Sequence, residues 1–215
     1  MSVLYSTTMP RVSQDHLDAR RRQVVEAALR CFARNGIHPT SMQDIFREAG
    51  LSAGAVYRYF PTKDSLVAAV VEQVLGLSQS AVNSGHARPQ ESPGLEDVVD
   101  RLLGVFTAPG PGDEQVRYGL ALQIWAEAIR SPQVGDALRT STQRLRAAVA
   151  ERIIEGQTRG QLRSDIEPLG LARALTALFE GYAFQRALDP AIDTGAYQRA
   201  VRALLEHGVG PAPVI

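Results

Sequence analysis

Residues 40–63 read TSMQDIFREAGLSAGAVYRYFPTK, and this stretch decides the fold. Thr40 and Ser41 offer N-cap hydroxyls for a helix over about 42–49. An acidic residue three positions after Ser41 can reach back to the helix start, as in a capping box. Gly50 stands where a left-handed residue is needed to end the helix. The stretch therefore begins with one short helix that has a start signal and a stop signal.

A second short helix follows directly. Ser52 is its N-cap, the helix is predicted over 53–59, and Pro61 stops it. Four apolar residues have the spacing that locks two such helices at a steep angle: Ile45, Ala49, Leu51 and Val56. Because the connection between the two helices is so short, the stretch predicts a helix-turn-helix.

A longer helix precedes this pair. Apolar residues at helical spacing predict it over 15–35, and Gly36 ends it. Three consecutive arginines near its start either touch DNA phosphates or form a solvated charge run: Arg20, Arg21 and Arg22. Residues 1–13 have no periodicity, so we expect a disordered arm, in which Arg11 either approaches DNA or belongs to a free tail.

The chain after Pro61 is predicted to be helical throughout. A long fourth helix extends to about residue 84, and breaks containing Pro or Gly separate the helices that follow. These are predicted over 95–107, 114–130, 132–155 with Ser131 as its cap, 168–188 and 194–207. The fold class is therefore all-α, with about nine helices. Residues 14–62 form a DNA-binding domain, and residues 63–215 form a larger helical domain.

The charges are divided unevenly, although the formal net charge is zero. Residues 1–66 hold nine Arg and Lys against six Asp and Glu, whereas the remainder holds fourteen against seventeen. A basic front is what phosphate binding needs. The only cysteine, Cys31, excludes an internal disulfide framework and fits a buried thiol in a reducing cytoplasm. No apolar run approaches the roughly 20 residues of a membrane-spanning helix, and no secretion signal is evident.

The sequence contains no pattern that is typical of an enzyme active site. The four histidines are scattered, and none stands at metal-ligand spacing with carboxylates or with Cys31. A Gly-rich phosphate loop after a strand and a nucleophile elbow are both missing. We therefore predict no enzyme activity, no metal and no cofactor.

Residues 21–70 closely resemble the TetR family of transcriptional regulators. The residues that carry the resemblance are Phe32, Gly36, Thr40, Ser41, Ile45, Ala49, Gly50, Ser52, Gly54, Tyr57, Tyr59, Phe60, Lys63 and Leu66. The C-terminal part is similar to the BetI-type subgroup through WAEAIRSPQV, GQTRGQLRSDIEP and ALFEGYAF. Three positions depart from the family pattern: Phe46 is larger than usual, and Ala53 and Ala55 replace polar or basic side chains.

The resemblance implies a two-domain homodimer in the cytoplasm that binds double-stranded operator DNA. In the family, the first three helices form a DNA-binding head, and the last two helices of each subunit pair as a four-helix bundle. A small-molecule effector bound in the body changes the spacing of the heads and releases the operator. The function predicted is a ligand-responsive repressor. Two alternatives stay open: an activator of the same family, and a ligand-binding or protein-interaction module without specific operator binding.

The predicted DNA contacts lie on and around the second helix of the motif. Small residues at its N-terminal end allow close approach to the major groove: Ser52, Ala53, Gly54 and Ala55. The phosphate contacts are expected from the Tyr57 and Tyr59 hydroxyls, from Lys63 at a helix start, and from Thr40 and Ser41. Arg58 contacts a base edge or a phosphate. For each residue alone, packing or capping is the competing explanation.

The predicted effector pocket is built from aromatic and polar residues of the body: Phe106, Tyr118, Trp125, Glu127, Tyr182, Gln185 and Arg186. Trp125 is the preferred candidate, because its large side chain on a central helix is a costly choice if it only fills space in the core. Glu127 near aromatic rings suits a cationic ligand, or it lies on the surface. The alternative for each aromatic residue is ordinary core packing. The helix over 168–188 is apolar on too many sides for one subunit to cover, which predicts a dimer.

Overall fold

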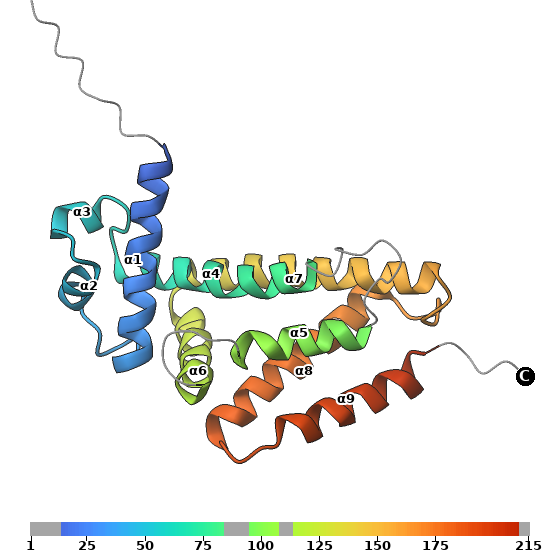
Figure 1. Ribbon diagram of the computed structural model, residues 1–215. Coiled ribbons are helices and arrows are strands. Elements are labelled where there is room, and N and C mark those ends of the chain that lie inside the picture. Colours follow the sequence, from blue (N-terminus) through green and yellow to red (C-terminus); the bar gives the residue numbers. More distant parts are fainter. Residues whose placement is uncertain (1–13, 84–94, 108–113, 211–215) are drawn as a thin grey trace, which may run out of the picture.

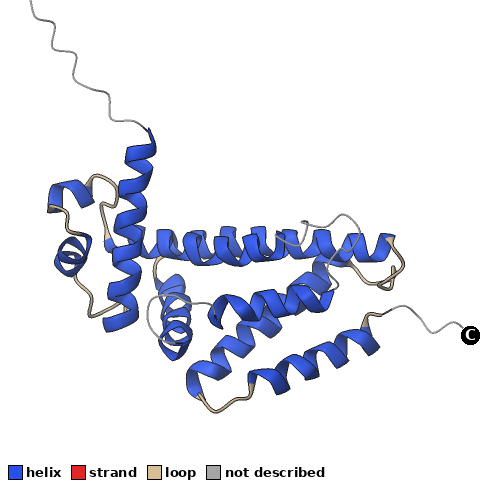
Figure 2. Ribbon diagram, viewed as in Figure 1, coloured by secondary structure: helices blue, strands red, loops and turns tan. Residues whose placement is uncertain are grey.

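The computed structural model describes residues 14–83, 95–107 and 114–210, apart from the side chains of 96, 97 and 105–107. Every regular element in this described part is a helix, which confirms the all-α prediction (Figure 2). The helices are α1 (Gln14–Asn35), α2 (Met42–Ala49), α3 (Ala53–Tyr57), α4 (Lys63–Asn83), α5 (Leu95–Thr107), α6 (Glu114–Arg130), α7 (Pro132–Thr158), α8 (Pro168–Leu188) and α9 (Thr194–Gly208). The predicted arm over 1–13, with Arg11, lies outside the described residues.

The start and stop signals of α2 are confirmed. The Ser41 hydroxyl accepts a hydrogen bond from the Asp44 amide at 3.2 Å, and the Asp44 carboxylate accepts one from the Ser41 amide at 3.0 Å. These reciprocal bonds form the predicted capping box. Hydrogen bonds from the Ser41 hydroxyl and amide hold the pKa of the Asp44 carboxyl below its usual value. Gly50 ends α2 in the left-handed region, with φ of 65°.

Two predicted helix ends were wrong. α7 continues to Thr158 instead of ending at about residue 155, and Gly156 is a buried position within the helix. A Cβ at Gly156 would lie 2.7 Å from a Leu162 methyl carbon, so the glycine admits that side chain. The end comes at Gly160, where φ is +71°. α3 ends two residues earlier than predicted, at Tyr57, and a short turn follows it.

The core consists of two hydrophobic clusters. The first joins α1, α2 and α3 with the first half of α4, and Leu120 and Ile124 of α6 and Val134 of α7 also belong to it. The second fills the space between the remainder of the helices. In Figure 1, α1–α3 form a head at one end of the molecule, and α4 and α7 lie side by side through the body. We call residues 14–62 the head and the remaining described residues the body.

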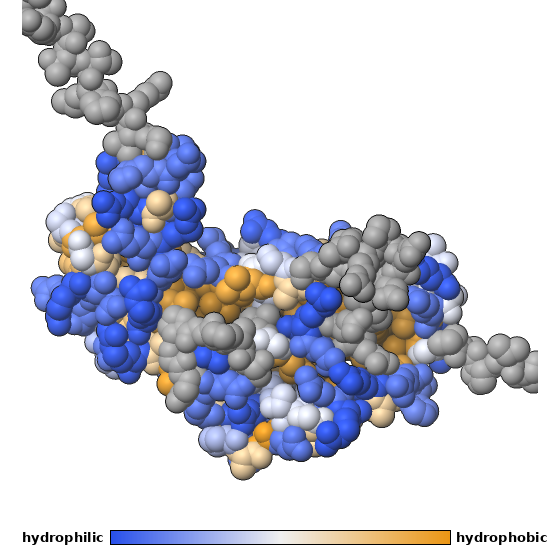
Figure 3. Space-filling view, in the orientation of Figure 1, coloured by the Kyte–Doolittle hydropathy of each residue, from blue (hydrophilic) through white to orange (hydrophobic). Residues whose placement is uncertain are grey.

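By length and composition, α4 is apolar enough to cross a membrane. In the structure its residues Leu66, Val67, Val70 and Val71 are buried in the first cluster. The helix also packs along α7 and against α1. Its apolar character is therefore that of a core helix that connects head and body. On the face shown in Figure 3, apolar side chains appear along α4 beside a mostly hydrophilic head.

Cys31 is buried in the first cluster, as predicted. Burial is the main reason why the pKa of its thiol is raised, and the nearby Glu48 carboxylate adds to this effect. A thiol in this environment stays protonated and unreactive.

The capping box generates a stability prediction. Ser41→Ala removes the hydroxyl that satisfies the Asp44 amide, and we expect a loss of about 1 kcal/mol of unfolding free energy. Urea denaturation of the full chain measures it, with Ser80→Ala on the exposed side of α4 as control. Equal midpoints for Ser41→Ala and the control would contradict the capping role.

Candidate DNA interface, head–body junction and ligand pocket

The N-terminal end of α3 is exposed and carries no bulky side chain. Ser52, Ala53 and Gly54 are exposed, and Ala55 is half-buried. The Ser52 hydroxyl accepts a hydrogen bond from the Ala55 amide at 3.3 Å, which confirms its capping role. No atom lies within 4 Å of a Cβ built at Gly54, so the surface there is open. This end of the head can approach another surface closely.

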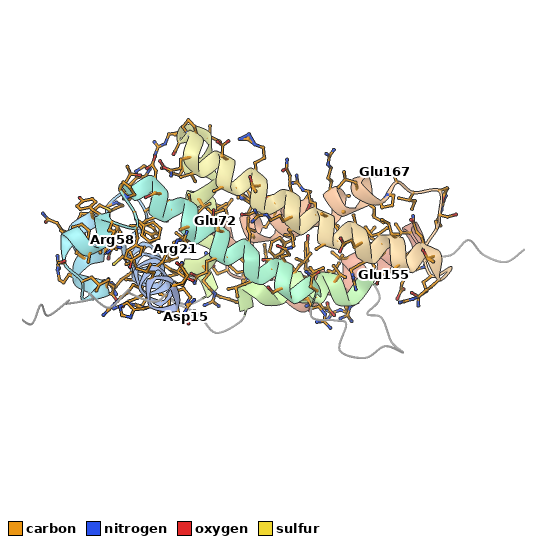
Figure 4. All side chains as sticks on the ribbon, turned by 90° about the horizontal axis from the view of Figure 1, so that it is seen from above. Asp15, Arg21, Arg58, Glu72, Glu155 and Glu167 are labelled. Atoms are coloured by element: carbon orange, nitrogen blue, oxygen red, sulfur yellow. The ribbon has the colours of Figure 1, made fainter. Side chains whose placement is uncertain are left out.

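Residues 57–59 have different environments. Tyr57 is 46% exposed, and the edge of its ring meets the Phe46 ring at 5.2 Å between centroids. The large Phe46 therefore fills the space between α2 and α3. Tyr59 packs against the first hydrophobic cluster. Arg58 is exposed, has no ion pair with any residue in the described part of the chain, and lies on the head in Figure 4.

Thr40 and Ser41 are engaged inside the head. Thr40 is buried, and its hydroxyl donates to the Gly36 carbonyl at 2.7 Å. In this conformation the Thr40 hydroxyl does not reach the surface, because it is hydrogen-bonded within the turn after α1. Ser41 is exposed, and its hydroxyl donates to the Asp44 carboxylate at 2.6 Å.

Lys63 is turned toward the chain. Its ammonium group donates to the carbonyls of Ile37, His38 and Thr40, at 3.0, 3.1 and 3.2 Å. An ammonium has three donors, so all of them have acceptors here. From the sequence we expected this group to contact a DNA phosphate, and no sequence pattern indicated the three carbonyls. A phosphate contact requires Lys63 to give up a carbonyl or to act through its charge alone.

The same turn is held from the body by α6. The Gln123 side-chain oxygen accepts a hydrogen bond from the Ile37 amide at 2.7 Å. Glu127, one helical turn further on, lies 3.3 Å from His38 Nε2 and 3.1 Å from Arg130 Nη2. We call this set of contacts on residues 37–40 the junction. Glu127 therefore belongs to the junction and not to the predicted pocket.

A second contact ties the body to the head-proximal end of α4. The hydroxyl of Ser131, the N-cap of α7, donates to the Asp64 carboxylate at 2.7 Å. Asp64 stands in the first turn of α4. The starts of α4 and α7 are thereby joined beside the junction.

A cavity of about 860 Å³ lies between α6, α7 and α8. Its lining includes Trp125, Leu138, Thr142, Arg146 and Glu180. A smaller, partly open cavity of about 60 Å³ lies beside it toward α4, and Trp125, Leu138, Thr142 and Glu180 line it as well. We call the two together the pocket. Trp125 is the one predicted pocket residue that lines it in the described part of the chain.

Glu180 was missed at the sequence level. Burial raises the pKa of its carboxyl, and the Arg146 guanidinium, 3.7 Å away, opposes that rise. Arg146 also donates from Nε to the Thr176 hydroxyl at 3.2 Å. The available signal was the single charge in the run ALFEGYAF of α8, where a half-buried carboxylate among apolar residues needs a reason.

The other predicted pocket residues lie elsewhere. Tyr118 and Tyr182 are fully buried, with ring centroids 5.9 Å apart. Arg186 lies over the Tyr118 ring and donates to the Glu114 carboxylate at 2.9 Å. This is a filled polar core cluster rather than a lined space. Gln185 is exposed on α8, and the Phe106 side chain lies outside the described residues.

Metal binding finds no site in the described part of the chain, since no group of three His, Cys, Asp or Glu side chains is placed to hold an ion.

Comparison with known proteins gives two family matches. Residues 24–70 match the family described as bacterial regulatory proteins, tetR family. Residues 97–210 match the C-terminal part of BetI-type transcriptional repressors. Together the two matches cover most of the head and most of the body.

Individual relatives agree with the family matches. The nicotine-responsive transcriptional repressor HdnoR of Paenarthrobacter nicotinovorans is 30% identical over 80% of this chain and 85% of its own. The structure of a transcriptional regulator from Saccharomonospora viridis in complex with choline superimposes with a TM-score of 0.71, at 25% identity over 90% of this chain and 98% of its own. Salmonella enterica GusR gives 0.70, at 25% identity over 91% and 97%.

The junction generates a prediction about local stability. Gln123→Ala leaves the Ile37 amide without its acceptor, and an unsatisfied amide costs about 1–3 kcal/mol. We expect the Ile37 amide to exchange its hydrogen about tenfold faster or more. Hydrogen-exchange mass spectrometry or NMR measures this, with Gln133→Ala on the exposed start of α7 as control. Unchanged exchange at Ile37 would show that Gln123 does not hold the turn.

Proposed function

Because the chain belongs to the TetR family of bacterial transcriptional regulators, with a BetI-type C-terminal part, we propose that it is a repressor that leaves its operator when a small molecule binds the body. The observation that carries the proposal is the shared helix α6. Trp125 of this helix lines the pocket, and Gln123 of the same helix holds the head. The effector pocket and the DNA-binding head therefore both contact helix α6.

The proposed division of labour follows the two parts of the chain. Residues 14–62 bind DNA, and residues 63–215 bind the effector and dimerise. Two relatives are described with small molecules, nicotine for HdnoR and choline for the Saccharomonospora viridis protein. The family and the relatives are regulators and not enzymes. We expect the protein to act in the cytoplasm, where its operator DNA lies.

For DNA contact we propose that α3 enters the major groove with its small N-terminal residues against the bases. Ala53 and Ala55 present methyl groups, which suit thymine methyl contact and reading of DNA shape. Tyr57, Tyr59 and Ser41 are the proposed phosphate contacts, and Arg58 reaches a base edge or a phosphate. The proposed role of Thr40 is indirect: its hydroxyl bonds to the Gly36 carbonyl and thereby fixes the turn that carries Ser41.

The Lys63→Ala variant distinguishes two possible roles of Lys63. Loss of either role would weaken DNA binding. If its charge contacts a phosphate, Lys63→Ala lowers the slope of log K against log salt by about 1. If it acts only by holding residues 37–40, the affinity falls while the slope stays unchanged. We expect the smaller slope, because the three hydrogen-bond partners of the ammonium group are uncharged carbonyls and not a carboxylate.

The measurement is fluorescence anisotropy with specific and random DNA over a salt series. Tyr57→Phe, which removes one hydroxyl at the surface, is expected to weaken binding to both DNAs alike. Arg144→Ala, on the exposed side of α7 in the body, is the matched control for loss of a positive charge. An unchanged slope for Lys63→Ala would contradict the phosphate contact.

For the homodimer we propose that the outer faces of α8 and α9 pair with their counterparts. On α8 the large apolar residues Leu178, Phe184 and Leu188 are exposed, and Leu204 is exposed on α9. Ala177 of α8 and Ala200 of α9 are also exposed, and small residues of this kind allow close helix approach. Exposed large apolar side chains gathered on neighbouring helices mark an interaction surface.

The dimer face generates its own prediction. Phe184→Glu places a carboxylate in the proposed apolar interface, where an unpaired charge costs several kcal/mol. We expect this variant to be a monomer at micromolar concentration in sedimentation and to bind operator DNA weakly. Leu77→Glu, an equally drastic change of an exposed leucine on α4, is the control and should remain dimeric. A dimeric Phe184→Glu variant would place the interface elsewhere.

The two alternatives are separated by assays on DNA upstream of the chain's own coding region. A gel shift at low salt that shows no complex favours a binding module without operator recognition. A transcription assay on the same fragment decides between repression and activation.

A further inference from the structure

Two side chains of α1 are bonded to the connection from which α3 begins, and we infer that Arg20 and Gln23 are positioning residues for the reading of DNA. They fix where α3 lies in the head, and thereby how its small residues meet the bases. The inference rests on the proposed contact between α3 and the major groove. It also assigns a role within the arginine run 20–22, for which the sequence allowed either phosphate contact or a solvated charge run.

Helix α3 cannot hold its own position. It has five residues, whereas an isolated helix shorter than roughly 12 residues is marginal in water. Among these five residues, all of them described, only Val56 is buried. The direction of α3 therefore depends on the segments that flank it, residues 49–52 before it and residues 58–60 after it.

The first flank is held by a chain of two hydrogen bonds from α1. Ala49 is the last residue of α2, where a helix leaves its carbonyls without partners inside the helix. Gln23 Nε2 donates to the Ala49 carbonyl oxygen at 2.8 Å, and Arg20 Nη1 donates to Gln23 Oε1 at 2.9 Å. Ala49 is buried, and Gln23 and Arg20 are half-buried, so both bonds are partly shielded from water.

Arg20 decides the orientation of the Gln23 amide. A guanidinium has only donors, so the amide must turn its oxygen toward Arg20. The amide NH2 group then faces the Ala49 carbonyl, which can only accept. A reversed amide would set donor against donor at Arg20 and acceptor against acceptor at Ala49. Both side chains are therefore needed to hold the end of α2, directly before the turn that leads to Ser52 and α3.

The neighbouring arginine lies against the other flank of α3. The Arg21 guanidinium carbon is 5.3 Å from the centroid of the buried Phe60 ring, and Nη2 is 3.6 Å from the Glu72 carboxylate. Figure 4 shows Arg21 on α1 and Glu72 on α4. Arg22 is exposed and has no ion pair with any residue in the described part of the chain. The three arginines have three different environments, which argues against a uniform phosphate-binding run.

The test compares the affinity for a selected duplex with the affinity for a random duplex of the same length. The selected duplex is the one that the wild-type full chain enriches from a pool of random sequences, and fluorescence anisotropy measures both affinities. Partial unfolding lowers both affinities alike, whereas a misplaced α3 loses base contacts and lowers their ratio. We expect Gln23→Met, which has a similar length but no donor, to reduce the ratio about tenfold.

A pair of arginine variants separates positioning from charge. Arg20→Ala and Arg22→Ala each remove one positive charge from the same part of α1. We expect Arg20→Ala to lower the ratio about threefold, a smaller loss because Gln23 keeps its donor, and Arg22→Ala to leave it unchanged. Gln133→Met, on the exposed start of α7, is the control for the glutamine change and should keep the wild-type ratio.

An unchanged ratio for Gln23→Met or for Arg20→Ala would overturn the inference. Equal losses for Arg20→Ala and Arg22→Ala would do the same, because they would assign the run to direct DNA contact. If circular dichroism shows that Gln23→Met is unfolded, the Arg20→Ala ratio decides. The wild type tests the proposed function separately. If it enriches no sequence, operator reading fails and the positioning role falls with it, whereas an enriched sequence with an unchanged Gln23→Met ratio removes the positioning role alone.

Discussion

The turn after α1 is the constraint on which the arrangement of head and body depends. Four backbone groups of residues 37–40 are hydrogen-bonded by side chains from other helices. The Lys63 ammonium of α4 donates to three carbonyls, and the Gln123 side-chain oxygen of α6 accepts from one amide. A buried or half-buried backbone group needs such a partner, and a connection between helices has none of its own. Since α2 begins directly after this turn, whatever moves the turn also moves the helix-turn-helix.

Helix α6 connects this turn to the pocket through its two faces. Gln123 and Glu127 are four residues apart, so they share the face that meets the head. Trp125 lies between them in sequence and therefore points to nearly the opposite side, where the pocket is. A ligand that displaces Trp125 acts on a rigid helix whose other face is bonded to the turn. Such a displacement biases the head when the two states differ in their affinity for the ligand.

What could be predicted from the sequence was local. Ser41, Gly50, Ser52 and Pro132 carry start and stop signals that act within one turn of a helix, and each was found where it was expected. The family resemblance, confirmed by the matches over 24–70 and 97–210, supplied the arrangement of these helices.

What could not be predicted depends on which face of a helix meets which neighbour. Glu127 and Glu180 are both acidic residues near aromatic ones in sequence, but only packing sends the first to the junction and the second to the pocket. Lys63 was expected to contact a phosphate because an ammonium group at a helix start can hold one together with the N-terminal amides of the helix. The three carbonyls that it binds come from a turn more than twenty residues earlier, which no local pattern reveals.

The most direct test of the account is footprinting of the full chain on DNA upstream of its own coding region. A dimer with one recognition helix in each head predicts two protected half-sites with two-fold symmetry, which disappear together when the effector is added. Protection of a single half-site, or protection that is the same on random DNA and does not respond to any ligand of the pocket, would contradict it.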